Sequence, residues 1–333
     1  MNRRGFGYGG IMKKKFAGNT SHSLSHVLKR DFQQNKYKYL LILPVLAYFV
    51  LFSYKPMYGL VIAFKDFRAN LGIWASPWLT KSEFNPNGLF RHFVNFFRDP
   101  YFFRLIKNTL SISLLTILFG FPAPILLAIL LNEIRNMAFR RTVQTITYMP
   151  YFISMVVVAS LIRNYTAQNG IFAQIAVALG GNGINYLMAP QYFYPIYVIS
   201  DIWQHIGWNS IIYLAAITGI DQEQYEAAII DGAGRFRRIL SITIPNLLPI
   251  IMVLFILRMG GILNVGFEKI ILLYNQNIYS VADVISTFVY RRGIQNADYS
   301  YATAVGLFNS VVNVIFLVTA NTLSRKYTQY GLY

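Results

Sequence analysis

Long apolar stretches are the feature of this sequence that most limits its fold. A helix needs about 20 mainly apolar residues to cross roughly 30 Å of hydrocarbon, because each helical residue advances about 1.5 Å. Lipid offers no hydrogen-bond partner to the backbone, so spans of this kind form helices. The sequence therefore predicts an all-α, polytopic membrane protein with six transmembrane helices. The predicted spans are Tyr39–Phe64, Asn108–Leu131, Val143–Ile162, Tyr192–Ile217, Leu248–Gly266 and Tyr301–Leu323.

The composition agrees with a membrane protein and excludes several other classes. Of the 333 residues, 55% are hydrophobic and 13% are charged, a balance that soluble domains of this length rarely have. The net charge of +17 does not indicate a nucleic-acid-binding protein, because the basic residues flank apolar runs instead of forming a solvated basic face. The absence of cysteine excludes disulfides, thiolate metal sites and cysteine nucleophiles.

The distribution of lysine and arginine predicts the orientation, because cytoplasmic flanks hold an excess of positive charge. Residues 1–38 form a basic tail, residues 39–333 form the membrane domain, and the loops that follow the second and fourth spans are also basic. We therefore expect both termini in the cytoplasm. One segment departs from the rule, because residues 65–107 would lie outside as a small cap and still carry seven basic residues. These are Lys65, Arg68, Lys81, Arg91, Arg98, Arg104 and Lys107.

A second outer segment has a different character. The loop from residue 163 to residue 191 is rich in glycine and contains an apolar stretch, residues 171–179, that is too short to span the membrane. We expect this stretch to lie at the outer interface.

The stretch Glu226–Pro249 reads EAAIIDGAGRFRRILSITIPNLLP and lies in the predicted cytoplasmic loop, residues 218–249. Asp221 is placed to cap a first helix, with Gln224 three positions later as in a capping box. Gly232 suits the left-handed end of that helix. A second helix would start near Arg235 and end at Pro245 and Pro249. The pattern predicts a helical hairpin, which suits docking in a groove of a partner protein. The alternative is an amphipathic helix lying on anionic lipid.

The order Glu-Ala-Ala, two residues, Asp-Gly-Ala and, after a spacer, Ile-Thr-Ile-Pro resembles the EAA loop of ABC importer permeases, which have the MetI-like fold. Other stretches resemble the oligosaccharide and polysaccharide branch of the maltose-type importers, namely residues 55–67, 72–78, 258–275 and 299–308. The sequence departs from that family at Ile239 and Ile244, where many relatives have phenylalanine and leucine. The resemblance implies a non-catalytic permease of the bacterial cytoplasmic membrane that forms half of the pathway for an oligosaccharide or polysaccharide-derived solute.

In that family the loop is a coupling helix, which sits in a cleft of an ATPase subunit. The resemblance therefore implies an ATPase contact at Glu226, Ala227, Ala228, Asp231, Gly232 and Ala233, with the hairpin held by Ile239, Ile242, Ile244 and Pro245. It also implies a second permease subunit, giving a heterodimer, two ATPase subunits, a solute-binding protein outside the cytoplasm, and surrounding membrane lipid. Because the chain lacks the G-x-x-x-x-G-K-[ST] phosphate-binding loop, we expect ATP and magnesium on the partner ATPase and no cofactor on this chain.

Polar side chains inside spans are costly, so each of them suggests a function. The fourth span supplies Trp203, His205, Trp208 and Asn209, and aromatic faces beside hydrogen-bonding groups suit sugar rings. The alternative is packing between helices. The fifth span adds Arg258 and Asn264 as further candidates for the substrate pathway.

Arg258 needs a partner inside the protein or must reach outward. We favour a structural pairing over contact with an anionic sugar. No metal site or catalytic set is expected. The alternatives to an importer are a transporter driven by an ion gradient, although the spans are nearly devoid of acids, and a membrane assembly protein.

Overall fold

The computed structural model describes residues 24–332, which form helices and loops without a β-strand. The chain divides into two units, Met1–Gly59 and Leu60–Tyr333. Within the first unit lie α1 (Leu24–Tyr48), a π-helical turn (Phe49–Tyr54) and α2 (Lys55–Met57). Helix α1 begins well before Tyr39, so the end of the predicted basic tail does not coincide with the start of a helix. The helix is broken at Asn35, where φ is −115° and ψ is 18°.

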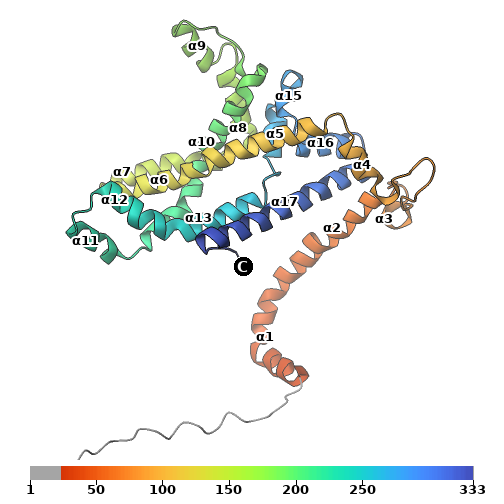
Figure 1. The fold of residues 1–333 in the computed structure, drawn as a ribbon, viewed down its shortest axis with the longest axis horizontal. Coiled ribbons are helices and arrows are strands. Elements are labelled where there is room, and N and C mark those ends of the chain that lie inside the picture. The colour runs from red at the N-terminus through yellow and green to blue at the C-terminus, as the bar shows by residue number, and fades with distance from the viewer. Residues whose placement is uncertain (1–23, 333) are drawn as a thin grey trace, which may run out of the picture. The chain divides into compact units, whose positions relative to one another are not determined.

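The second unit holds the other helices (Figure 1). They are α3 (Gly72–Ala75), α4 (Arg91–Phe97), α5 (Phe102–Leu115), α6 (Pro122–Glu133), α7 (Met137–Tyr148), α8 (Met155–Thr166), α9 (Ile171–Ala178), α10 (Pro190–Thr218), α11 (Gln222–Ile230), α12 (Arg235–Arg238), α13 (Ile244–Met259), α14 (Phe267–Leu273), α15 (Tyr279–Ala282), α16 (Ile285–Tyr290) and α17 (Tyr299–Thr328). The turn between α6 and α7 and the α11–α12 hairpin lie at one end of this unit, and α4 and α16 lie at the other (Figure 1).

Four helices in the described part of the chain are long and apolar enough to cross a membrane: Asp31–Phe64, Phe102–Glu133, Arg235–Met259 and Tyr299–Thr328. They cover the first, second and sixth predicted spans. The fifth predicted span, Leu248–Gly266, is helical only as far as Met259, so its predicted end is wrong. The fourth predicted span is one 29-residue helix, α10. It is not among the four because polar side chains such as Asp201 and His205 lower its hydropathy. The predicted total of six spans stays a prediction.

The third predicted span, Val143–Ile162, is wrong as a continuous helix. The helical segments Met137–Phe152 and Met155–Ala178 meet at a bend of 100°. Pro150 lacks a backbone donor and lies in a 3₁₀ turn. Ser154 then adopts an extended conformation and caps α8 by accepting a bond from the backbone N of Val157 at 3.5 Å. These residues interrupt the helix and start a new one in another direction.

Three prolines in the long helices each follow a π-helical turn. The turns Phe49–Tyr54, Thr116–Gly120 and Ile239–Thr243 are each followed two residues later by a proline, namely Pro56, Pro122 and Pro245. A proline lacks the N–H that would bond the carbonyl four residues earlier, and its ring collides with that carbonyl. In all three cases this carbonyl lies inside the wider π-helical turn, which accommodates the ring without ending the helix.

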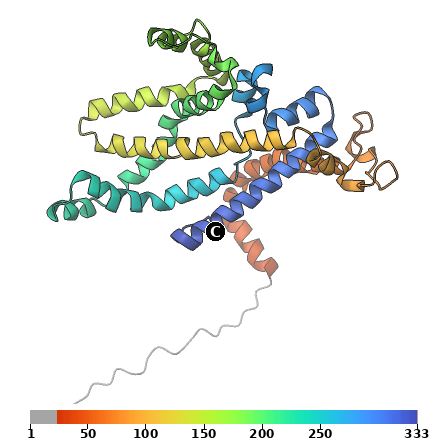
Figure 2. The ribbon, with the colours of Figure 1, turned by 45° about the horizontal axis from the view of Figure 1, so that its top comes forward.

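Helix α10 packs against α6 and α7, and in Figure 2 it runs at an angle across α6. Gly207 makes the approach to α7 possible, since a Cβ atom at this position would lie 2.1 Å from the carbonyl oxygen of Thr147. Tyr213, Ile217 and Leu247 belong to the buried cluster between α6, α10 and α13.

The predicted outer cap is tied to the start of α17. Lys65 is buried, and its ammonium donates to the carbonyl oxygens of Ile73 at 2.7 Å and Trp74 at 3.2 Å. The hydroxyl of Ser300 donates to the carbonyl of Lys65 at 2.8 Å. These bonds satisfy a buried cation with backbone acceptors.

Candidate functional site

The predicted hairpin is present as α11 and α12, joined by a tight turn. Asp221 accepts a hydrogen bond from the backbone N of Glu223 at 3.0 Å, which confirms the predicted cap. Gly232 has a φ of +77°, so a glycine is required there for the left-handed turn. The predicted capping box is not formed, because the side chain of Gln224 instead accepts a bond from the amide of Asn246 at 3.1 Å.

The prediction that Pro245 and Pro249 end the second helix is wrong. Residues Arg235–Met259 form one uninterrupted helix, in which Pro245 lies in the first turn of α13 and Pro249 lies inside it. The wider π-helical turn Ile239–Thr243 makes room for the ring of Pro245, so the helix continues. The second arm of the hairpin is therefore the start of a membrane helix, so a force on the hairpin acts on that helix directly.

Packing holds the base of the hairpin. Ile239 and Ile244 pack against the cluster of Tyr213, Ile217 and Leu247. The hydroxyl of Tyr225 on α11 lies 2.9 Å from that of Thr243. Ile242 is half-buried and Pro245 is exposed.

The tip of the hairpin is open. Glu226, Ala227, Asp231 and Gly232 are exposed, whereas Ala228 and Ala233 are half-buried. Two large apolar side chains stand beside them, since Ile230 is 86% exposed and Phe236 is 74% exposed. Sequence reasoning did not single out Ile230, although an isoleucine directly before the Asp-Gly turn is a signal for it. Exposed apolar groups ringed by small and charged residues are typical of a protein-binding surface.

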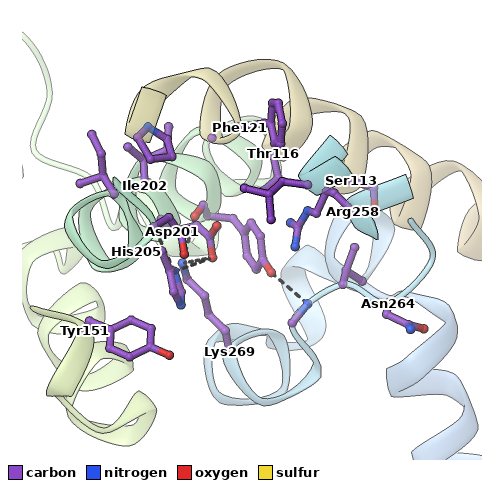
Figure 3. A pocket seen from close by; sticks show the side chains of 18 of the residues that line it. Ser113, Thr116, Phe121, Tyr151, Asp201, Ile202, His205, Arg258, Asn264 and Lys269 are labelled. Carbon is purple, nitrogen blue, oxygen red and sulfur yellow. Dashed lines mark hydrogen bonds and ion pairs between the residues drawn. The ribbon is translucent and has the colours of Figure 1, made fainter. Parts of the chain in front are cut away.

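A second candidate site is a cavity of about 640 Å³ lined by α5, α6, α10, α13, the start of α14 and the segment before α14 (Figure 3). Its wall includes His205, Asn209, Arg258 and Asn264 from the predicted pathway. Trp203 and Trp208 do not line it. Trp208 instead stacks on Tyr151, with ring centres 4.6 Å apart and planes at 5°.

An ionic group that the sequence did not bring together occupies one wall of the cavity. Asp201 lies 3.5 Å from the Nδ1 atom of His205 and 3.7 Å from the ammonium of Lys269. Lys269 is almost fully buried and donates to the carbonyl of Tyr197 at 3.1 Å. Burial lowers the pKa of Lys269 to about 8, although the nearby Asp201 carboxylate acts in the opposite direction. Tyr197 also accepts a bond from the backbone N of Gly266 at 3.1 Å, so these contacts hold the start of α14 on α10.

Arg258, from α13, lines the same cavity as that group (Figure 3). Its side chain is exposed and has no hydrogen-bond or ion-pair partner among the described residues. The expected structural pairing of Arg258 stays a prediction, because Arg258 is close enough to Asp201 for their charges to interact without forming an ion pair. Asn264 is held in place, since its side-chain oxygen accepts bonds from Asn309 at 2.8 Å and Asn313 at 3.2 Å. The lining carries two cations and two acids, Arg258, Lys269, Asp201 and Glu268, of which Lys269 and Asp201 neutralise each other.

Known proteins resemble this chain over most of its length. Residues 120–329 match the family described as binding-protein-dependent transport system inner membrane component. Protein LplB of Bacillus subtilis (strain 168) is 46% identical over 307 residues, which are 92% of each protein. The polygalacturonan/rhamnogalacturonan transport system permease protein YteP of the same strain is 45% identical over 301 residues, which are 90% of this chain and 91% of YteP.

Two solved structures are also similar. One is a crystal structure of a bacterial ABC transporter involved in the import of the acidic polysaccharide alginate, with a TM-score of 0.82, 44% identity, and coverage of 91% of this chain and 99% of that one. The other is a crystal structure of a bacterial alginate ABC transporter in complex with an alginate pentasaccharide-bound periplasmic protein. It has a TM-score of 0.82, 43% identity, and coverage of 92% of this chain and 99% of that one.

Proposed function

The chain belongs to the family of binding-protein-dependent transport system inner membrane components, and we propose that it forms half of the pathway for an acidic oligosaccharide in an ABC importer. Like its named relatives, the chain is a component of a transporter and not a catalyst. Membership of this family sets aside a transporter driven by an ion gradient and a membrane assembly protein.

An acidic solute is supported first by the chemistry of the cavity. The exposed, unpartnered guanidinium of Arg258 is a donor for a sugar carboxylate, since arginine binds carboxylates through two parallel hydrogen bonds. Asn264 and Asn209 add amide groups for hydroxyls. The relatives named for polygalacturonan/rhamnogalacturonan and for alginate handle acidic polysaccharides, which agrees with this chemistry.

Coupling to ATP hydrolysis is assigned to the α11–α12 hairpin. Its exposed tip, with Ile230 and Phe236 beside Glu226 and Asp231, fits a cleft in a separate ATPase subunit. In this proposal the importer contains a second permease, two ATPase subunits that bind ATP and magnesium, and a solute-binding protein. The hairpin and both termini face the cytoplasm.

Uptake into proteoliposomes tests the solute. The importer is reconstituted with its binding protein, and accumulation of a tetragalacturonide is compared with that of maltotetraose, a neutral glycan of equal length. We expect ATP-dependent accumulation of the acidic glycan alone. Equal uptake of the neutral glycan would contradict an acidic substrate.

A further inference from the structure

A buried carboxylate at the end of the unit opposite the hairpin is shared by two arginines. Asp283 is fully buried, and Arg291 donates to its two oxygens at 2.8 and 2.7 Å. Arg104, at the start of α5, donates to the same carboxylate at 3.3 Å. The start of α5 lies beside α15 and α16 (Figure 1). We call Arg104, Asp283 and Arg291 the outer arginine cluster.

Holding the fold together accounts for only part of this cluster. The bidentate pair of Asp283 and Arg291 satisfies the buried charge. Asn108 donates to the carbonyl of Asp283 at 2.9 Å and thereby ties α5 to the α15–α16 segment. Arg104 is a second cation on one carboxylate, so the cluster keeps a surplus positive charge. Its Nε atom is buried and has no hydrogen-bond partner among the described residues.

The surplus charge is accessible and lies among aromatic rings. The side chains of Arg104 and Arg291 are 34% and 24% exposed. Arg104 lies 4.4 Å from the ring centre of Tyr101, and Arg291 lies 5.4 Å from that of Tyr279. Arginine and tyrosine in a fixed arrangement at a surface are typical of the residues that contribute most to protein–protein binding.

The direction of Arg104 favours a docked protein over a passing solute. Ser113, further along α5, lines the cavity. The two residues are nine positions apart, which is about two and a half helical turns, so they lie on opposite sides of α5. The cluster therefore points away from the cavity. Arg104 itself belongs to the basic segment 65–107, which holds seven lysines and arginines but only three acids, Asp66, Glu83 and Asp99.

We propose that the outer arginine cluster is the docking point for an acidic side chain of the solute-binding protein. The inference rests on the proposed function, which supplies that partner and places this end of the unit outside. A cation that is held by a buried carboxylate is pre-positioned, so little side-chain entropy is lost when the partner binds. A docking role also explains why segment 65–107 is positively charged, although positive charge is usually in excess on the cytoplasmic side.

The test substitutes Arg104→Gln, because Asp283 keeps its bidentate partner Arg291 in this variant. The assembled importer is reconstituted in nanodiscs, and its ATPase activity is titrated with its solute-binding protein loaded with tetragalacturonide. We expect the half-saturating concentration of binding protein to rise about tenfold, with unchanged basal and maximal rates. The difference between wild type and Arg104→Gln should shrink at high salt, because salt screens the charge of Arg104 in the wild-type importer.

Two further variants keep the result interpretable. Arg104→Lys retains the charge and should restore most of the affinity. Arg98→Gln removes one exposed cation of the same outer segment outside the cluster and should have little effect. An equal half-saturating concentration of binding protein in wild type and Arg104→Gln would overturn the docking role. The docking role would also be overturned if Arg104→Gln changed only the dependence of ATPase activity on glycan concentration. A wild-type importer that no binding protein stimulates would instead contradict the proposed function.

Discussion

At the scale of a residue, the contacts of Arg258 determine which interactions are open to it. An arginine between apolar neighbours in a membrane helix must find a partner, reach water or contact a ligand. Lys269 on the wall of the same cavity has such partners in Asp201 and Tyr197, whereas Arg258 makes no hydrogen bond or ion pair with a described residue and interacts with Asp201 only through its charge. The two cations therefore differ in their contacts: Lys269 holds α14 on α10, and Arg258 is exposed on the cavity wall.

We expect Arg258→Gln to raise the KM for uptake of a tetragalacturonide about tenfold, because a hydrogen bond to a charged group contributes about 1.5–3 kcal/mol. Assembly with the second permease should be unchanged. Transport kinetics in proteoliposomes and size-exclusion chromatography measure the two quantities. Arg258→Lys, which keeps the charge, serves as the control. Loss of assembly in Arg258→Gln would instead assign it a structural role.

At the scale of an element, the hairpin is a rigid extension of a membrane helix. Arg235–Met259 is continuous, and the base of the hairpin is held by the contact of Tyr225 with Thr243 and by the packing of Ile239. The turn at Gly232 is the point where the two arms join. We therefore expect a movement of the tip to be transmitted to α13, which lines the cavity.

We expect Gly232→Pro to abolish uptake while ATP hydrolysis persists, because proline fixes φ near −65° and cannot adopt the observed +77°. Gly234→Ala is the matched control: Gly234 has a φ of −65°, and a Cβ atom there would contact nothing within 4 Å. Uptake and ATPase activity are measured on the same proteoliposomes. Normal uptake by Gly232→Pro would count against coupling through this turn.

At the scale of the whole molecule, the proposed contact of the hairpin with an ATPase subunit sets the orientation. The α11–α12 hairpin shares its end with the turn between α6 and α7, which contains Arg135 (Figure 1). A cytoplasmic hairpin thus places this basic turn in the cytoplasm too, in agreement with the usual distribution of positive charge. The segment 65–107 then lies outside.

The chain contains no cysteine, so single cysteines report topology without removal of native ones. We expect Arg68→Cys to react with a membrane-impermeant maleimide in intact cells, whereas Arg135→Cys should react only after permeabilisation. Both positions are exposed. The reverse pattern would invert the orientation and contradict the assignment of the hairpin to the ATPase.

Local features of the sequence were sufficient for the membrane class, for the hairpin with its Asp221 cap and its turn at Gly232, and for the resemblance to importer permeases. These features depend on hydropathy and on hydrogen bonds between residues a few positions apart. Tertiary structure decided the rest. Four features depend on packing between helices. They are the bend after Pro150, the continuation of the helix beyond Pro245, the contact of Asp201 with Lys269, and the exposure of Arg258 on the cavity wall. Residues 68 positions apart, such as Asp201 and Lys269, meet only because the helices that carry them fold against each other, which no local pattern records.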